Sequence, residues 1–93
     1  MTIKHSESGS KGRFYIDEDG RQLGEMTYSK AGDTMIIIDH TEVSEELKGQ
    51  GAGKKLVFFG AHWARENGKK VLPLCPFAKA IFQRFDEIQD VLK

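Results

Sequence analysis

Alternating apolar and polar positions predict three strands in the first half of the chain. Arg13–Ile16 (RFYI) and Gln22–Ser29 (QLGEMTYS) are two of them, and Asp17–Gly20 between them has turn-forming residues. Thr34–Val43 (TMIIIDHTEV) is rich in β-branched residues, and its continuous apolar run predicts burial on both faces. Turns as short as these favour an antiparallel meander.

A helical pattern and a further strand follow in the second half. Apolar residues recur at helical spacing over residues 53–67, which end at Asn-Gly, a suitable helix stop. Lys70–Leu74 reads as a strand, so the helix predicts a right-handed crossover to a parallel partner. Pro76–Phe85 predicts a second helix, and residues 86–93 a short helical turn. The helix residues expected in the core are Leu56, Phe59, Trp63, Ala64, Phe77, Ile81 and Phe85.

These elements predict one α+β domain over residues 12–93. Its sheet is expected to be mixed, mostly antiparallel and about four strands wide. Residues 1–11 are polar, and we expect them to be flexible. The chain of 93 residues is long enough for one modest core.

Charge and cysteine content narrow the class of protein. The 14 basic and 14 acidic side chains cancel, so neither nucleic acid nor an acidic membrane is expected as a partner. The single cysteine has no metal-ligand cluster around it, so no metal is expected either. No apolar stretch approaches the ~20 residues of a membrane helix. We expect a cytoplasmic protein, a monomer or a weak homodimer paired through a sheet edge.

Three glycines alternate immediately before the first helix, in KGQGAGKK (Lys48–Lys55). A helix start attracts phosphate, glycines allow close approach of the backbone, and the lysines add positive charge. The segment therefore suits a diphosphate, although a flexible glycine connector would have the same composition. It is not a P-loop, because Lys55 stands where Ser or Thr is required. It is not a dinucleotide fingerprint, because Leu56 and Lys54 stand where the third glycine belongs.

Lys48–Gly53 resembles the pyrophosphate-binding signature Arg/Gln-x-x-Gly-x-Gly/Ala of the GNAT acyltransferase superfamily, with lysine in the first place. The stretches IDHTEVSEELKGQGAGKKLV and LPLCPFAKAIF resemble a small single-domain subfamily of GNAT-like N-acetyltransferases. The resemblance implies a minimal GNAT-like acyl-CoA fold with a crossover helix, a C-terminal helix and acetyl-CoA as acyl donor. It also implies a bulge at the end of the strand before the signature, at Glu42 and Val43. The cofactor-binding residues implied are Glu42, Val43, Lys48, Gly49, Gln50, Gly51, Ala52, Gly53 and Lys54.

The chain departs from the larger superfamily in the parts that usually shape the acceptor pocket. It lacks helices between its first strands and further strands at its C-terminus, so the acceptor stays open. The common Ala-x-x-Leu-Tyr, whose tyrosine often protonates the departing thiolate, is matched by Ala78-x-x-Ile81-Phe82, and Phe82 has no hydroxyl. Cys75 replaces an asparagine that is common three residues before that alanine.

His40 and Cys75 are the candidate catalytic residues. His40 lies late on the central strand and suits a base for an acceptor amine, with Glu42 on the same face to orient it; a histidine bonded only to backbone or water is the alternative. Cys75 lies near a helix N-terminus, which favours a nucleophilic or acidic role; a buried filler is the alternative. Lys79 and Arg84 are either contacts to the 3′-phosphate of CoA or solvated charges.

The sequence thus predicts an N-acetyltransferase that moves an acetyl group from acetyl-CoA to an unidentified amine, on a small molecule or a protein. Two alternatives stay open. The first is a module that binds acetyl-CoA without transferring from it, as the truncated acceptor region and Phe82 would allow. The second is a thioester hydrolase that uses Cys75 and His40. The products distinguish the three functions. A transferase gives an acetylated amine, a binding module gives no product, and a hydrolase gives free acetate.

Overall fold

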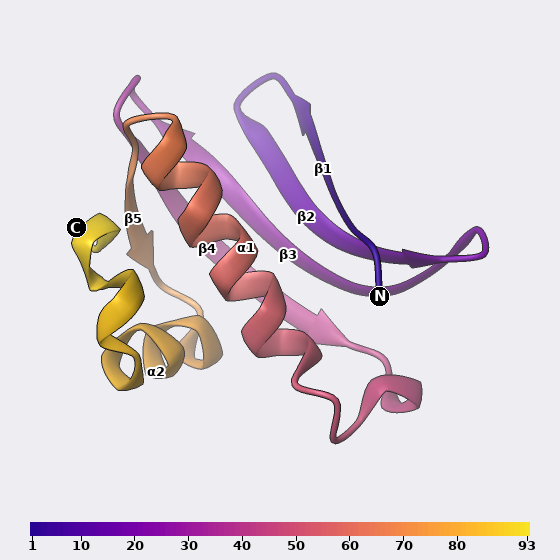
Figure 1. Cartoon of the computed structure of the whole chain (residues 1–93). Coiled ribbons are helices and arrows are strands. Elements are labelled where there is room, and N and C mark those ends of the chain that lie inside the picture. The colour runs from indigo at the N-terminus through magenta and orange to yellow at the C-terminus, as the bar shows by residue number, and fades with distance from the viewer.

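The computed structural model describes residues 1–93 and shows a five-stranded sheet with two α-helices (Figure 1). The strands lie in the sheet in chain order, from β1 at one edge to β5 at the other. The elements are β1 (Ile3–Ser8), β2 (Lys11–Glu18), β3 (Arg21–Ala31), β4 (Met35–Val43), η1 (Glu45–Leu47, a 3₁₀ turn), α1 (Ala52–Glu66), β5 (Lys70–Pro73), α2 (Pro76–Arg84) and η2 (Asp86–Val91, 3₁₀). Each predicted strand and helix is present, with bounds that differ by a few residues.

The N-terminal segment forms a strand, so the prediction of a flexible segment over residues 1–11 is wrong. Strand β1 pairs antiparallel with β2 and brings the sheet to five strands rather than about four. Its anchor is His5, which stacks on Phe14 with ring centroids 4.4 Å apart and meets Trp63 edge-on at 4.8 Å. A polar aromatic side chain therefore packs on the core and fixes the edge strand, a role that an apolar side chain usually has.

Strands β1 to β4 form an antiparallel meander, and α1 connects β4 to the parallel strand β5. The predicted mixed sheet with a crossover helix is confirmed. Pairing of β4 with β5 ends at Ile38 and Pro73. The carbonyl of Ile38 then accepts hydrogen bonds from Leu74 N–H at 3.1 Å and Cys75 N–H at 3.2 Å. Beyond this point β4 continues to Val43 with no strand on that side, which leaves a V-shaped gap, the β4–β5 gap.

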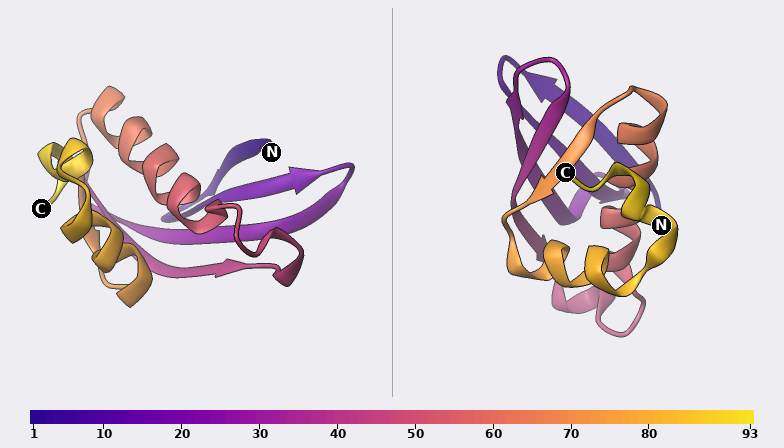
Figure 2. Two further views of the ribbon diagram at one scale, coloured as in Figure 1. Left: turned by 60° about the horizontal axis from the view of Figure 1, so that its bottom comes forward. Right: turned by 90° about the vertical axis from the view of Figure 1, so that its left-hand side faces the viewer.

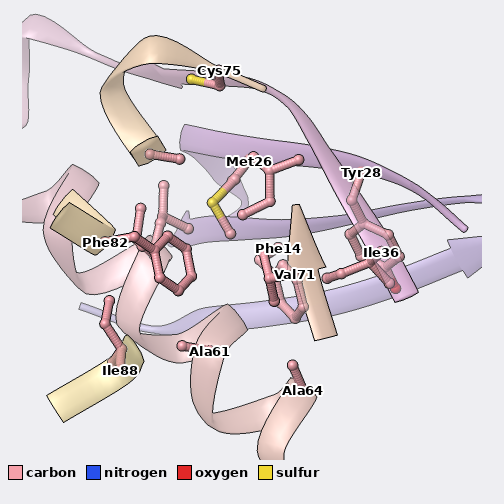
Figure 3. Close-up of a cluster of buried hydrophobic side chains, with 14 of the residues drawn as sticks. Phe14, Met26, Tyr28, Ile36, Ala61, Ala64, Val71, Cys75, Phe82 and Ile88 are labelled. Carbon is pink, nitrogen blue, oxygen red and sulfur yellow. The ribbon is translucent and has the colours of Figure 1, made fainter. Parts of the chain in front are cut away.

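Both α-helices and η2 cover one face of the sheet, the helix face, while the other, the open face, carries no helix (Figures 1 and 2). One cluster of 19 buried apolar residues fills the space between the helix face and the helices. In Figure 3, Phe14 and Met26 of the sheet, Ala61 of α1 and Phe82 of α2 meet in this cluster, and Cys75 lies at its margin.

Burial follows the helix face more strictly than the sequence predicts. Strand β4 is not buried on both faces, because Ile36 and Ile38 are buried against the helices while the intervening Ile37 stays partly exposed. Two aromatic residues expected in the core are exposed, Phe59 at 38% and Phe77 at 43%. Three further residues that were expected in the core, Trp63, Ile81 and Phe85, are partly buried against it. No helix combines the length and the apolar composition needed to cross a bilayer.

An irregularity in β4 decides which of its later side chains reach the helix face. The register with β3 shifts directly after Ile38, where Asp39 is an extra residue, a β-bulge. Alternation therefore restarts one residue late: over residues 40–43 the odd-numbered side chains lie on the helix face and the even-numbered ones on the open face. The bulge was expected at Glu42 and Val43, which instead pair regularly with β3.

Candidate active site

Two glycines before α1 have backbone angles that residues with side chains rarely adopt. Gly49 has φ 81°, and Gly51, the N-cap of α1, has φ 68°. The turn that they form leaves the N–H groups at the helix start without an acceptor within the chain. These groups belong to Gly51, Ala52, Gly53 and Lys54. Free donors at the positive end of a helix attract anions, above all phosphate.

Gly53 is required for a different reason, a close contact with α2. A Cβ atom at this position would lie 2.6 Å from the ring of Phe77, closer than side-chain carbons approach one another. Phe77 therefore packs directly on the backbone at the start of α1. The three alternating glycines thus have two functions: Gly49 and Gly51 form the turn, and Gly53 admits an aromatic ring.

A cavity of about 480 Å³ lies between the end of β4, the start of α1 and one side of α2. We call it the α1–α2 cavity. Its charged lining residues are Lys48, Lys54 and Arg84, and no carboxylate lines it. The ammonium of Lys54 also lies 4.2 Å from the ring centre of Phe85. The larger apolar lining residues are Val43, Leu47, Phe77, Ile81 and Phe85.

Most of the predicted cofactor-binding residues surround this cavity. Those that line it are Val43, Lys48, Gly49, Gly51, Ala52, Gly53 and Lys54. Glu42 does not, because its side chain lies on the open face. Gln50 does not either, and its side-chain amide donates to the carbonyl of Glu46 at 3.5 Å. Of the two basic residues of α2 that were considered as CoA contacts, Arg84 lines the cavity, whereas Lys79 lies away from it, near Leu72–Leu74 and the C-terminus.

The backbone of β4 offers hydrogen-bonding groups along the gap. Ser44 N–H donates to a carbonyl of β3 at 2.8 Å, so strand alternation directs the N–H and C=O groups of Val43 and Thr41 away from β3. No strand pairs with that side of β4 after Ile38. The free backbone groups therefore belong to Thr41 and Val43, whereas those of Glu42 face β3.

Cys75 lies at the apex of the β4–β5 gap, as the N-cap of α2. It is buried, with 6% of its surface exposed, and its Sγ donates to Thr41 Oγ1 at 3.5 Å. Burial disfavours the thiolate, but the Thr41 hydroxyl and the backbone N–H groups of Ala78, Phe77 and Thr41 favour it, and together they lower the pKa of Cys75. The two N–H groups of α2 act by proximity, since neither makes a cap hydrogen bond to the neutral thiol. Cys75 itself does not line the cavity, whereas Thr41 does.

His40 and Glu42 lie together on the open face, as the alternation predicted. His40 Nε2 is 3.5 Å from Glu42 Oε2, and both side chains are exposed, at 66% and 79%. No hydrogen bond joins His40 to Cys75, which lies on the helix side of the sheet. The two candidate catalytic residues therefore do not form a dyad, and a hydrolase that needs such a dyad finds no support in this geometry.

Two features of the cavity were not predicted: Thr41, and the apolar residues of its α2 side, which were expected in the core. Helix α2 carries two apolar stripes: Ala78 and Phe82 are buried, while Phe77, Ile81 and Phe85 line the cavity at four-residue spacing. An apolar surface this broad on a nine-residue helix is a signal that the sequence does contain. Thr41 has no such signal, because its face depends on the bulge before it.

The family model for GCN5-related N-acetyltransferases matches residues 13–91 of the chain. A GCN5-like protein of Staphylococcus aureus, solved by NMR, is 42% identical; its similarity covers 97% of this chain and 87% of that one, with a TM-score of 0.73. The chain therefore belongs to the GCN5-related N-acetyltransferase family. Among curated proteins, none matches the chain.

More distant structures share the fold. Tetrahymena GCN5 is 12% identical with a TM-score of 0.68, and the similarity covers 83% of this chain but 51% of that one. An acetyltransferase of Bacillus anthracis in complex with acetyl coenzyme A is 16% identical with a TM-score of 0.57, covering 71% of this chain and 39% of that one. The chain thus spans about half of the first of these proteins and about two fifths of the second.

Proposed function

We propose that the protein binds acetyl-CoA in the α1–α2 cavity and transfers its acetyl group to a primary amine. The observation that carries the proposal is the distribution of groups around this cavity. Free N–H donors and the cations Lys48, Lys54 and Arg84 lie beside an apolar wall, with no carboxylate among them. A molecule with phosphates at one end and an uncharged arm at the other fits this distribution. Membership of an N-acetyltransferase family supports the same assignment.

The cofactor's parts match different elements of the site. The pyrophosphate accepts hydrogen bonds from the N–H groups of residues 51–54, and Lys48 and Lys54 neutralise its charge. The pantetheine arm follows the free edge of β4, where Thr41 and Val43 offer backbone groups as a neighbouring strand would. The arm then leads to the gap, so that the thioester comes to lie beside Cys75.

Cys75 acts as the nucleophile in this proposal. Its thiolate attacks the acetyl carbonyl, the bond from that carbon to the CoA sulfur breaks, and CoA leaves as a thiolate that takes up a proton. The acceptor amine then attacks the acetyl-Cys75 thioester, and the C–N bond forms as the C–Sγ bond breaks. The lowered pKa of Cys75 favours this role over that of an acid, because a thiol that ionises more readily holds its proton less often.

His40 serves the second half of the reaction, as the base that takes the proton of the amine. It is exposed on the open face, on β4 two residues beyond the last pairing with β5. Glu42, 3.5 Å from its ring, stabilises the imidazolium that results. The acceptor therefore approaches from the open face, opposite to the cofactor.

Calorimetric titration with CoA tests the cofactor site. A valine at Gly51 strains the left-handed turn and crowds the phosphate, so Gly51→Val is expected to weaken binding at least about tenfold. Gly9→Val is the matched control, because Gly9 has a similar φ of 62° and equally open surroundings but lies in the β1–β2 turn. Unchanged affinity in a folded Gly51→Val protein would contradict the proposed site.

Mass spectrometry after mixing with acetyl-CoA alone tests the chemistry. An acetyl adduct on Cys75 that disappears when an amine is added supports the nucleophile, and Cys75→Ala should then impair transfer far more than CoA binding. Bound CoA should also protect Cys75 from alkylation. An acetylated amine without any adduct would indicate direct transfer, and free acetate alone would indicate a hydrolase.

A further inference from the structure

We propose that Thr41 is a positioning residue, whose hydroxyl holds the Cys75 sulfur next to the α1–α2 cavity and donates a hydrogen bond to it when the thiol ionises. The inference rests on the proposed function, because it assigns a role within the same site. Neither the glycine signature nor the helix pattern points to this residue.

The position of Thr41 is set by the fold. It lies on the part of β4 that has no strand beside it, and the bulge at Asp39 turns its side chain to the helix face. Cys75 approaches the same place from β5, held by its N–H bond to the Ile38 carbonyl at 3.2 Å. Thr41 thus lines the cavity and also accepts the side-chain hydrogen bond of the thiol.

The chemistry of the contact suits a hydroxyl. In the neutral state Sγ–H donates to Thr41 Oγ1 at 3.5 Å. When the thiol loses its proton, the hydroxyl can rotate and donate to the thiolate instead, because a threonine hydroxyl is both donor and acceptor. A hydrogen bond to a charged partner is about twice as strong as one between neutral groups, so the switch favours the thiolate. The backbone N–H groups of Ala78, Phe77 and Thr41 add to this effect, but they cannot turn, and Thr41→Val keeps all of them.

Thr41→Val isolates the hydroxyl. Valine keeps the shape of threonine and is well accepted in strands, so the fold and the access to Cys75 are preserved. Thr41→Ser is the rescue variant, because it keeps the hydroxyl and loses only a methyl group. Thr34→Val makes the same exchange in the exposed turn before β4, away from the cavity, and serves as control.

The experiment measures the rate of alkylation of Cys75 by iodoacetamide between pH 6 and 10 in the intact protein. The chain has one cysteine, so every adduct reports this site. In Thr41→Val we expect the rate at pH 7.5 to fall about tenfold and the whole profile to move to higher pH, with the plateau at high pH unchanged. Thr41→Ser and Thr34→Val should stay within about twofold of wild type. The rate at the high-pH plateau measures the access of iodoacetamide to Cys75. The position of the profile along the pH axis measures how readily the thiol ionises.

A folded Thr41→Val protein with the wild-type profile would overturn the proposal, and so would a Thr41→Ser protein that behaves like Thr41→Val. Should Thr41→Val fail to fold, Thr41→Ala, which also lacks the hydroxyl, decides in its place. Acetylation by acetyl-CoA is measured separately on the same samples. If wild type forms no acetyl adduct and acetylates no amine, the proposed function is rejected, while the alkylation profile still decides the role of Thr41.

Discussion

At the residue scale, Gly53 shows how a close contact can reverse the usual effect of a substitution. Alanine in a helix is normally more stable than glycine by about 1 kcal/mol, because glycine has the greater freedom in the unfolded chain. At position 53 the added methyl group would meet the Phe77 ring at 2.6 Å, so either the ring or the start of α1 has to move. Either movement would change the wall of the α1–α2 cavity, which Phe77 and Gly53 both line.

We therefore expect Gly53→Ala to lower the free energy of unfolding and to weaken CoA binding about tenfold or more. In a Phe77→Ala background the same change should instead raise the free energy of unfolding, by up to about 1 kcal/mol. Urea denaturation and calorimetry on the four proteins of this double-mutant cycle measure both effects. Equal effects of Gly53→Ala with and without Phe77 would contradict the packing argument.

His40 allows a second prediction at this scale. As the proposed base, it takes part only in the transfer of the acetyl group to the amine. His40→Gln is expected to lower turnover by about 10²–10⁴-fold, with the rate of Cys75 acetylation by acetyl-CoA unchanged. His62→Gln, an exposed histidine of α1, is the control. A variant at position 40 that keeps the wild-type turnover would leave His40 as a surface residue.

At the scale of elements, the sequence predicts those whose pattern is strong. Residues 34–43 and 53–67 have β-branched and helical patterns that leave little choice, and β4 and α1 form there. β1 was not predicted, because its sequence IKHSES has one apolar residue, and the ring contacts of His5 that anchor it are between residues far apart in the chain. Local pattern contains no information about such contacts.

In the candidate site, too, some features could be predicted from the local sequence and others could not. The glycine turn was found because its residues are contiguous and their backbone requirements are particular to glycine. The face of each residue after Asp39 could not be found, since one extra residue in a strand inverts the alternation of all that follow. Thr41 was overlooked for this reason. Glu42 was assigned to the cofactor because the resemblance implies it, whereas the bulge at Asp39 places its side chain on the open face.

The anchoring of β1 also makes an element-scale prediction about pH. His5 Nε2 lies 2.5 Å from Tyr28 Oη, which donates to Glu7 at 2.5 Å, and Glu7 in turn pairs with Lys30 at 3.1 Å. Burial beside the aromatic rings lowers the pKa of His5; Glu7 opposes this shift and Lys30 adds to it. Below the ordinary histidine value of about 6.5, the unfolded chain therefore binds more protons than the folded one.

It follows that the contribution of His5 to stability is complete above about pH 6.5 and is lost as the pH falls through the lowered pKa of the folded state. Urea denaturation at pH 7.5 and pH 5.5 should show a fall in the free energy of unfolding, and His5→Gln should show a smaller one. Glu7, whose pKa is also lowered, contributes its own loss only at more acidic pH. An equal loss in wild type and His5→Gln would show that other groups cause the pH dependence.

At the scale of the whole molecule, five strands and two helices suffice to arrange the proposed chemistry. The helix face holds the cavity, the open face carries His40, and Cys75 lies where the pairing of β4 with β5 ends. Only one side of the sheet is covered (Figure 2).

The uncovered side of the sheet has a kinetic consequence. In the proposed arrangement acetyl-CoA and the amine bind on opposite faces of the sheet and both react at the sulfur of Cys75. CoA that is still bound after the first step would then not block the binding of the amine. The enzyme would follow a double displacement with two separate half-sites, in which CoA inhibits competitively against acetyl-CoA but noncompetitively against the amine. Product-inhibition plots with purified protein and any accepted amine measure this directly. Competition between CoA and the amine would mean that both substrates use the same side of the sheet.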